Sequence, residues 1–304
     1  MHLSFRQIDI FRVVAQLESY TRAAEKLHLT QPAVSMQVKQ LEEDTGLALF
    51  ERHGKRMRLT NSGKELLHYA NQVLHSYSDM LSAIEDLRDL SSGHLVISVA
   101  TTATYFITKL LADFTTQHEG ITLTLDVTNR QQLLLQLENF EPDLVIMGEP
   151  PKGHNLSSER LMENPLVVIA SPRHPLAGRQ QIKLQEITNE RFAVRERGSG
   201  TRNAIERHFM SHGVECNSTL EMRSNETIKH SAEAGLGLGI VSLHTIQLEL
   251  EAGRLVVLNV ESFPIRRHWH IVTRKGKRLT QVARLFRDFV KREAPRTPLL
   301  NFPT

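Results

Sequence analysis

Apolar residues within residues 1–60 recur at helical spacing and predict three short helices in succession. In the first helix, Ser4 and Gln7 form a capping-box pair, and the apolar positions are Phe5, Ile8, Phe11, Val14 and Leu17. The second helix is predicted over residues 22–27, with Thr21 as its N-cap. Its small apolar face would consist of Ala23, Ala24 and Leu27.

The third helix follows after a tight turn and carries polar residues at its exposed start. Thr30 is suited to cap it, and Pro32 falls in the first turn, where no backbone N–H is missed. Its inward face is predicted to be Val34, Val38 and Leu41, which leaves Gln31, Ala33, Ser35, Met36, Gln37 and Lys39 pointing outward. Amides, hydroxyls and an ammonium at a helix start suit a reader of the DNA major groove. An ordinary helix pair with a solvated face would show the same pattern.

A basic hairpin is predicted after the third helix, in the stretch ERHGKRMRLT, where Gly54 marks a turn between two short extended arms. Arg52, Lys55, Arg56 and Arg58 lie on these arms and could reach phosphates. Three helices and a basic hairpin form a winged helix-turn-helix, which we assign to residues 3–60. The residues expected to contact DNA are Thr30, Gln31, Pro32, Ala33, Ser35, Met36, Lys39, Arg52, Lys55 and Arg56.

A long helix is predicted over residues 61–90, because apolar residues there alternate in steps of four and three: Leu66, Ala70, Val73, Tyr77, Met80, Ile84 and Leu87. Leu67, Leu74 and Leu81 add a second row. A helix of about 28 residues would span ~40 Å, longer than an average helix within a domain. We therefore favour a dimerising linker over a core helix, and we expect a hinge at Ser91-Ser92-Gly93.

From residue 94 onward, apolar strands alternate with helices, which predicts an α/β region with parallel sheets. The expected strands include HLVISVA, TLTLDV, DLVIM, RFAVRE, TLEMR, GIVSL and HWHIVTR. A second set of elements opens at residue 165, and the chain returns near residue 266. Two α/β lobes are expected, the first over residues 94–164 and 266–304 and the second over residues 165–265.

Ligands in such folds bind at the carboxyl ends of strands, near helix N-termini. Three stretches qualify: the threonines after the first strand, the segment RERGSGTR and the segment SNETIK. Their hydroxyl groups, the backbone N–H groups that glycine leaves accessible, and the arginine guanidinium could bind an anion or a polyol. The residues expected to bind an effector are Thr101, Thr102, Asn129, Ser199, Thr201, Arg202 and Asn225.

Composition agrees with a soluble globular protein of two or three domains: 304 residues, of which 40% are hydrophobic and 23% charged. No apolar run approaches the ~18–20 residues of a membrane span, and the N-terminus lacks a signal-peptide layout. The one cysteine, Cys216, excludes an internal disulfide, fits the cytoplasm and is more simply a bystander than a redox sensor. The histidines show no metal-ligand spacing, so neither a metal nor a cofactor is expected.

The stretch AAEKLHLTQPAVSMQVKQLEEDTGLALFER, with RLTNSG after it, resembles the N-terminal signature of LysR-type transcriptional regulators. The two-lobed region resembles their effector-binding domain, whose fold is shared with periplasmic binding proteins. The resemblance implies double-stranded DNA and RNA polymerase as partners, and assembly into a homodimer and a homotetramer. Family members often carry an arginine that reads a base at the position of Met36, so base readout there is in doubt.

In the second lobe, ASPRHPLAG, RGSGTR, SNETIK and SLHT resemble the Calvin-cycle (RuBisCO operon) regulators of the CbbR/RbcR type. That subgroup implies a phosphorylated or related central metabolite, or NADPH, as effector. A LysR-type regulator of another operon with a non-phosphorylated effector is the alternative. An enzyme is disfavoured because no G-x-S-x-G elbow occurs and AGLGLG lacks the strand-first context of a dinucleotide site. The helix-turn-helix argues against a solute-binding protein.

Overall fold

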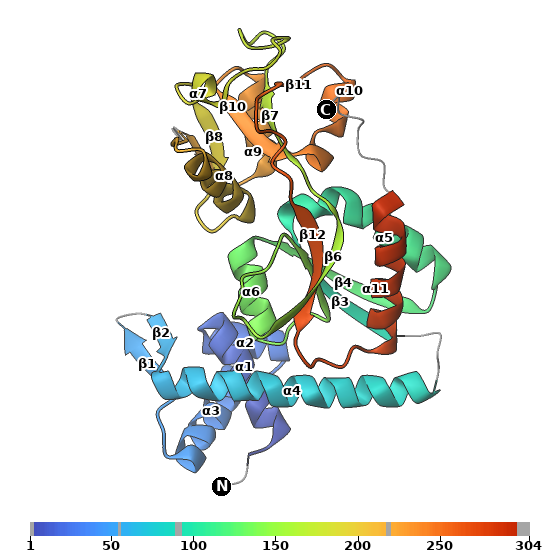
Figure 1. The fold of residues 1–304 in the computed structure, drawn as a ribbon. Coiled ribbons are helices and arrows are strands. Elements are labelled where there is room, and N and C mark those ends of the chain that lie inside the picture. The colour runs from blue at the N-terminus through green and yellow to red at the C-terminus, as the bar shows by residue number, and fades with distance from the viewer. Residues whose placement is uncertain (1–2, 54–55, 89–92, 217–219, 297–304) are drawn as a thin grey trace. The chain divides into compact units, whose positions relative to one another are not determined.

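The computed structural model describes residues 3–53, 56–88, 93–216 and 220–296. The chain divides into two compact units (Figure 1). The first contains the N-terminal residues up to Arg88 together with Glu138–Glu141, and the second contains the remainder.

The N-terminal part of the first unit is a three-helix domain with a two-stranded hairpin. The helices are α1 (Phe5–Leu17), α2 (Tyr20–Leu27) and α3 (Gln31–Thr45), and the hairpin pairs β1 (Phe50–His53) with β2 (Arg56–Leu59) in antiparallel register. All three predicted helices and the hairpin are confirmed. Their shared core is formed by residues from each helix: Ile10, Val13, Val14, Ala23, Ala24, Val34 and Val38.

Of the three helix N-caps predicted from the sequence, the structure confirms two and corrects the third. Ser4 and Gln7 form the capping box of α1, and the Thr30 hydroxyl accepts a hydrogen bond from the Ala33 N–H. The prediction that Thr21 caps the second helix is wrong, because α2 begins at Tyr20 and its N-cap is Ser19. The Ser19 hydroxyl already accepts the Arg22 N–H at 3.3 Å, so Thr21 lies inside the first turn.

Helix α4 (Asn61–Arg88) is 28 residues long, which confirms the predicted long helix. Its start packs into the three-helix domain, where Ala70, Leu66 and Leu67 join a cluster with Phe11, Leu41 and Leu49. Further along, the apolar row is not covered: the exposed fractions of Val73, Tyr77, Met80, Leu81 and Ile84 are 42%, 41%, 50%, 43% and 42%. Ser91 and Ser92 of the predicted hinge lie outside the described residues, as does the side chain of Leu87.

The second unit contains two lobes, each built on a five-stranded sheet. In lobe I the strand order is β4-β3-β5-β12-β6, formed by β4 (Ile121–Thr128), β3 (Gly93–Ala100), β5 (Leu144–Met147), β12 (His268–Arg274) and β6 (Leu156–Glu163). The 3-10 helices η1 (Thr101–Ala103) and η3 (Ala294–Arg296) and the helices α5 (Thr104–Gln117), α6 (Arg130–Glu138) and α11 (Gln281–Glu293) complete the lobe.

In lobe II the strand order is β11-β7-β10-β8-β9, formed by β11 (Val256–Val257), β7 (Leu166–Ala170), β10 (Leu238–Ser242), β8 (Phe192–Arg195) and β9 (Leu220–Met222). Its helices are α7 (Leu184–Ile187), α8 (Gly200–Ser211), α9 (Asn225–Glu233), η2 (Leu243–Thr245) and α10 (Gln247–Glu251). Across the two lobes, the elements that were not predicted are β6, β11, α7, α10 and the three 3-10 helices η1, η2 and η3.

The expectation of parallel sheets is only partly correct, because both sheets are mixed. β3 is parallel to β4 and β5, whereas β12 is antiparallel to β5 and β6. In lobe II, β8 is parallel to β9 and β10, whereas β7 is antiparallel to β10 and β11. The antiparallel strands β7 and β12 are those that the chain forms just after it passes between the lobes, so they are not joined to their neighbours by the helical crossovers that produce parallel pairs.

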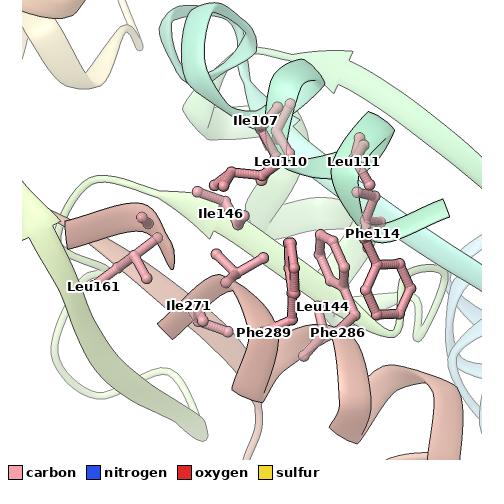
Figure 2. Packing of buried hydrophobic residues seen from close by; sticks show 14 of the residues in the cluster. Ile107, Leu110, Leu111, Phe114, Leu144, Ile146, Leu161, Ile271, Phe286 and Phe289 are labelled. Carbon is pink, nitrogen blue, oxygen red and sulfur yellow. The ribbon is translucent and has the colours of Figure 1, made fainter. Parts of the chain in front are cut away.

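The core of lobe I lies between its sheet and the helices α5 and α11 (Figure 2). Figure 2 shows how the two helices contribute Ile107, Leu110, Leu111, Phe114, Phe286 and Phe289, which pack on Leu144, Ile146, Leu161 and Ile271. Alternate residues of β5, Val145 and Met147, pack instead with Leu133 and Leu137 of α6. Helices therefore cover both faces of the sheet, and its polar strand ends are left to line a site.

Candidate functional site

The exposed face of α3 is the first candidate site, because its opposite face is fully committed to the core. Val34, Val38 and Leu41 are buried, while the side chains predicted to contact DNA are exposed or half-buried: Thr30, Gln31, Pro32, Ala33, Ser35, Met36 and Lys39. Met36 is 66% exposed, so its side chain is accessible to a binding partner.

The hairpin is anchored to α3 by Glu42, a residue that the sequence analysis missed. Its carboxylate accepts hydrogen bonds from the Leu49 N–H at 2.7 Å and the Phe50 N–H at 3.2 Å, at the point where β1 begins. A glutamate followed by a short loop is too common a pattern to reveal this role. Arg52 on β1 is exposed, whereas Lys55 and the side chain of Arg56 lie outside the described residues.

A second candidate site is a cavity of about 350 Å³ between the two lobes. It lies at the carboxyl ends of the parallel strands β3, β4 and β5, beside the start of α8 and of β12. Such strand ends leave backbone N–H groups and loop side chains free to bind a ligand. The polar and charged residues that line it include Thr101, Thr102, Thr128, Asn129, Arg130, Glu149, Arg160, Arg195, Ser199, Thr201, Arg207, His208, Arg266, Arg267, His268 and His270.

Two arginines in the cavity join the lobes through threonine hydroxyls. Arg195, at the end of β8, donates from Nη1 to the Thr101 hydroxyl of lobe I at 3.4 Å, while Glu196 holds its other nitrogens at 2.8 and 3.0 Å. Arg267 donates to the Thr201 hydroxyl of lobe II at 3.3 Å. Both contacts are long for hydrogen bonds, and a stronger acceptor could replace them.

Arg267 lies in one of the two segments that connect the lobes. Its Nε donates to the Asn164 carbonyl at 3.2 Å, and the Asn164 N–H donates to the Arg267 carbonyl at 2.7 Å. The two connecting segments are therefore hydrogen-bonded to each other at Arg267.

Positive charge in this cavity exceeds the negative charge that balances it. Arg195 is paired with Glu196, and Arg266 lies 3.9 Å from Glu163. Among the described residues, no acidic side chain forms an ion pair with Arg130, Arg160, Arg207 or Arg267. Burial, together with the nearby Arg130 and Arg207, lowers the pKa of Arg267 to about 9. Burial and Arg207 likewise lower the pKa of Arg130. An anion in the cavity would relieve this repulsion.

Five of the seven predicted effector-binding residues line this cavity: Thr101, Thr102, Asn129, Ser199 and Thr201. The structure does not bring Arg202 there. Its guanidinium donates to Glu206 at 2.7 Å, to Glu221 at 2.6 Å and to the Arg195 carbonyl. These carboxylates, Glu206 first, raise its pKa. Arg202 is therefore already paired on another face of lobe II.

Asn225 does not line the cavity either. It is buried at the start of α9, and that end of the helix faces α5, where the Tyr105 hydroxyl donates to Glu226. The motif SNETIK thus forms a contact between the lobes rather than a wall of the cavity.

The arginines that dominate the cavity, Arg130, Arg160, Arg207 and Arg267, were missed as site residues. They come from α6, β6, α8 and the segment just before β12, so no contiguous motif unites them. One feature of the sequence could have indicated the site: the adjacent Arg266 and Arg267, where the chain was predicted to return to the first lobe.

The described part of the chain contains no group of three or more His, Cys, Asp or Glu side chains that could hold a metal ion. Burial, with Glu206 nearby, raises the pKa of the Cys216 thiol to about 12, so this thiol lacks the thiolate character of a redox sensor. No described helix is both long enough and apolar enough to cross a bilayer.

Two family models match the chain. Residues 5–64 match the "Bacterial regulatory helix-turn-helix protein, lysR family", and residues 88–295 match the "LysR substrate binding domain". The chain is 51% identical over 296 residues to the RuBisCO operon transcriptional regulator of Allochromatium vinosum, covering 97% of this chain and 98% of that protein. It is 42% identical to the transcriptional regulator CbbR of Rhodospirillum rubrum, covering 95% of this chain and 96% of that one.

Solved structures resemble the chain over the same regions. The regulatory domain of Synechocystis CcmR in complex with 2-PG is 38% identical, covers 70% of this chain and all of that chain, and superposes with a TM-score of 0.65. A full-length OxyR variant from Pseudomonas aeruginosa covers 100% of both chains with a TM-score of 0.74, and at 21% identity it supports the fold alone.

Proposed function

Because this chain belongs to the LysR family of transcriptional regulators, we propose that it controls carbon-fixation genes in response to a phosphorylated metabolite. The relatives named for the RuBisCO operon and CbbR, similar over nearly the whole chain, support the choice of target genes. The CcmR complex with 2-PG supports a small-molecule effector in the regulatory domain.

The observation that carries the choice of effector is the excess of guanidinium groups in the cavity between the lobes. Arg130, Arg160, Arg207 and Arg267 line it without an acidic ion-pair partner among the described residues. Guanidinium groups bind phosphate oxygens in a bidentate manner, and the hydroxyls of Thr101, Thr102, Ser199 and Thr201 can donate to the remaining oxygens. We therefore propose that the phosphate group binds here.

In this proposal, residues 3–60 bind double-stranded DNA in the cytoplasm, residues 61–90 pair two chains, and residues 94–304 bind the effector. The uncovered apolar row of α4 supports a homodimer. Assembly into a tetramer and contact with RNA polymerase are proposed on the resemblance to the family.

The effector would act by changing the angle between the lobes. Arg195–Thr101 and Arg267–Thr201 are the weak contacts that join the lobes in the cavity, and an anion would compete for both guanidinium groups. A ligand shifts such an equilibrium only by its differential affinity for the two arrangements. A coupling of ~1–3 kcal/mol to DNA binding is the usual size.

A calorimetric screen of the full chain tests the proposed effector class. Ribulose bisphosphate, phosphoenolpyruvate, 3-phosphoglycerate, 2-PG and NADPH would be titrated, followed by promoter footprinting with each compound that binds. We expect at least one to bind and to change the footprint on a carbon-fixation promoter. If none binds, while a non-phosphorylated metabolite shifts the footprint, the proposed effector class is wrong.

Two substitutions should separate base readout from backbone contact in the DNA-binding domain. Gln31→Ala should cost ~1–3 kcal/mol of specific affinity and relax the preference at one base pair. Arg52→Ala should weaken specific and random DNA to the same extent and reduce the salt slope by about 1. Binding to both kinds of DNA would be measured by fluorescence anisotropy at several salt concentrations. Identical behaviour of the two variants would contradict this division of roles.

Anion affinity in the cavity should increase as pH falls from 8 to 6. Burial lowers the pKa values of His208 and His270, the latter also through His268 and Arg160. Both residues line the cavity. A bound anion favours their protonated forms, so affinity rises until the pH falls below their pKa values in the free protein. Each unit by which the anion raises a pKa contributes about tenfold.

Sulfate is the appropriate titrant for this measurement, since it does not change charge between pH 6 and 8. The double variant His208→Gln and His270→Gln should flatten the pH profile, whereas His118→Gln, outside the cavity, should preserve it. A profile that stays steep in the double variant would show that other groups are responsible.

A further inference from the structure

Glu149 is the one acidic side chain among the described residues that line the cavity between the lobes. It follows β5 and Gly148, at the same strand-end edge as Thr101 and Asn129. It also lines an adjoining groove of about 670 Å³, which shares Arg130, Gly200 and Arg207 with the cavity. Glu149 thus stands where the cavity continues into the groove.

The carboxylate of Glu149 is available to a ligand. Its backbone carbonyl accepts a hydrogen bond from Arg130 at 2.5 Å, but within the described part of the chain its carboxylate forms neither a hydrogen bond nor an ion pair. Its negative charge acts on both Arg130 and His270, where it opposes the lowering of their pKa values by burial.

We propose that Glu149 determines selectivity in this cavity: its carboxylate accepts hydrogen bonds from hydroxyl groups at the uncharged end of a phosphorylated ligand. Charge-assisted hydrogen bonds from hydroxyls to a carboxylate are strong, and acidic side chains read ribose hydroxyls in the same way in dinucleotide-binding folds. The same charge repels an ionised group placed at that position. The inference rests on the proposed function, since it presumes that the phosphate binds among the arginines.

The two ends of the ligand therefore meet different surroundings. The phosphate lies near Arg267, Thr101 and Thr201, and a polyol portion lies toward Glu149 and the groove. A phosphorylated polyol satisfies both ends. A phosphate ester with an alkyl tail leaves Glu149 desolvated without a donor, which is unfavourable.

Glycerol 3-phosphate and n-propyl phosphate form a matched pair for the test, because they differ only in two hydroxyl groups. Trp269, the single tryptophan of the chain, is buried in the cavity wall, so its fluorescence can follow both titrations. Calorimetry would give the same affinities independently. The full chain would be used as wild type, Glu149→Ala, Glu149→Gln and Glu119→Gln. Glu119 is exposed on lobe I and does not line the cavity.

The wild type should bind glycerol 3-phosphate about tenfold more tightly than n-propyl phosphate, as expected for a charge-assisted hydrogen bond. In Glu149→Ala this ratio should fall to about one, because glycerol 3-phosphate loses its acceptor and n-propyl phosphate no longer meets the carboxylate. Glu149→Gln should give an intermediate ratio, and Glu119→Gln should keep the wild-type ratio.

An unchanged ratio in Glu149→Ala would overturn this inference and leave the proposed function intact. So would equal affinities of the wild type for the two compounds. If the wild type bound neither compound nor any other phosphate ester, the proposed function would fail, and the inference with it.

Discussion

A variant carrying Arg267→Gln is expected to bind the proposed phosphorylated effector about 100-fold more weakly, as is typical when one partner of a buried charge pair is removed. Arg267 contributes a guanidinium that is partly withdrawn from water and lacks an acidic partner in the described structure, so the effector would be its counter-ion. Operator binding without effector should stay unchanged. Calorimetry for the effector and anisotropy for the operator would measure the two effects separately.

Arg202→Gln is the matched control, since the same type of side chain is removed from a position that the sequence favoured for effector binding. Arg202 is paired with Glu206 and Glu221, so its loss should change effector affinity by no more than about twofold, as for a residue that contacts no ligand. The opposite pattern, with Arg202→Gln defective and Arg267→Gln normal, would refute our assignment of the cavity.

Thermal stability without effector distinguishes a binding defect from misfolding. The folded state lowers the pKa of Arg267 to about 9, which means that it disfavours the charged form relative to the unfolded chain. Neutral glutamine removes that penalty at all pH values below about 9. The free energy of unfolding of the free variant, measured by thermal melting, should therefore fall by no more than the loss of the Asn164 and Thr201 hydrogen bonds explains, about 1 kcal/mol each.

The double substitution Val73→Asp and Ile84→Asp should dissociate the protein into monomers and abolish tight operator binding. Both side chains belong to the exposed apolar row of α4, and two carboxylates there would face two more from the partner helix. Loss of one DNA-binding domain from a two-site complex weakens binding by a factor of about 100 or more. Sedimentation velocity and gel-shift titration would record both effects.

Ser76→Asp and Ser78→Asp provide a control with the same added charge on the same helix. Both serines are exposed and lie outside the apolar row, so this double variant should keep the wild-type mass. An unchanged mass for the Val73 and Ile84 variant would exclude α4 as the dimer contact.

Local signals in the sequence predicted most individual elements. The apolar spacing and the cap at Thr30 predicted α3, and the row from Leu66 to Ile84 predicted α4, because both depend on contacts between residues a few positions apart. The error at Thr21 had a local cause as well: two hydroxyl residues, Ser19 and Thr21, could each have capped α2, and only the geometry of the preceding turn selects Ser19.

The arrangement of the cavity could not be predicted in the same way. Arg130, Arg160, Arg207 and Arg267 come from three elements and a connecting segment, and they meet only after the sheets have formed. It was equally impossible to predict that Arg202 points away from the cavity, because its partner Glu221 on β9 lies 19 positions away along the chain. Hydroxyl-rich strand ends, by contrast, follow from the α/β pattern, which is why Thr101, Thr102, Ser199 and Thr201 were predicted to share a site.

The hydrogen bonds between Arg267 and Asn164 have an evolutionary consequence. One residue both lines the cavity and fastens together the segments about which the lobes would turn. A lineage that adapts to a new metabolite by changing this residue would also change how strongly the bound metabolite alters the lobes. Drift in specificity should therefore proceed through residues confined to one lobe, such as Asn129 or Ser199. Efforts to engineer a new response should begin there.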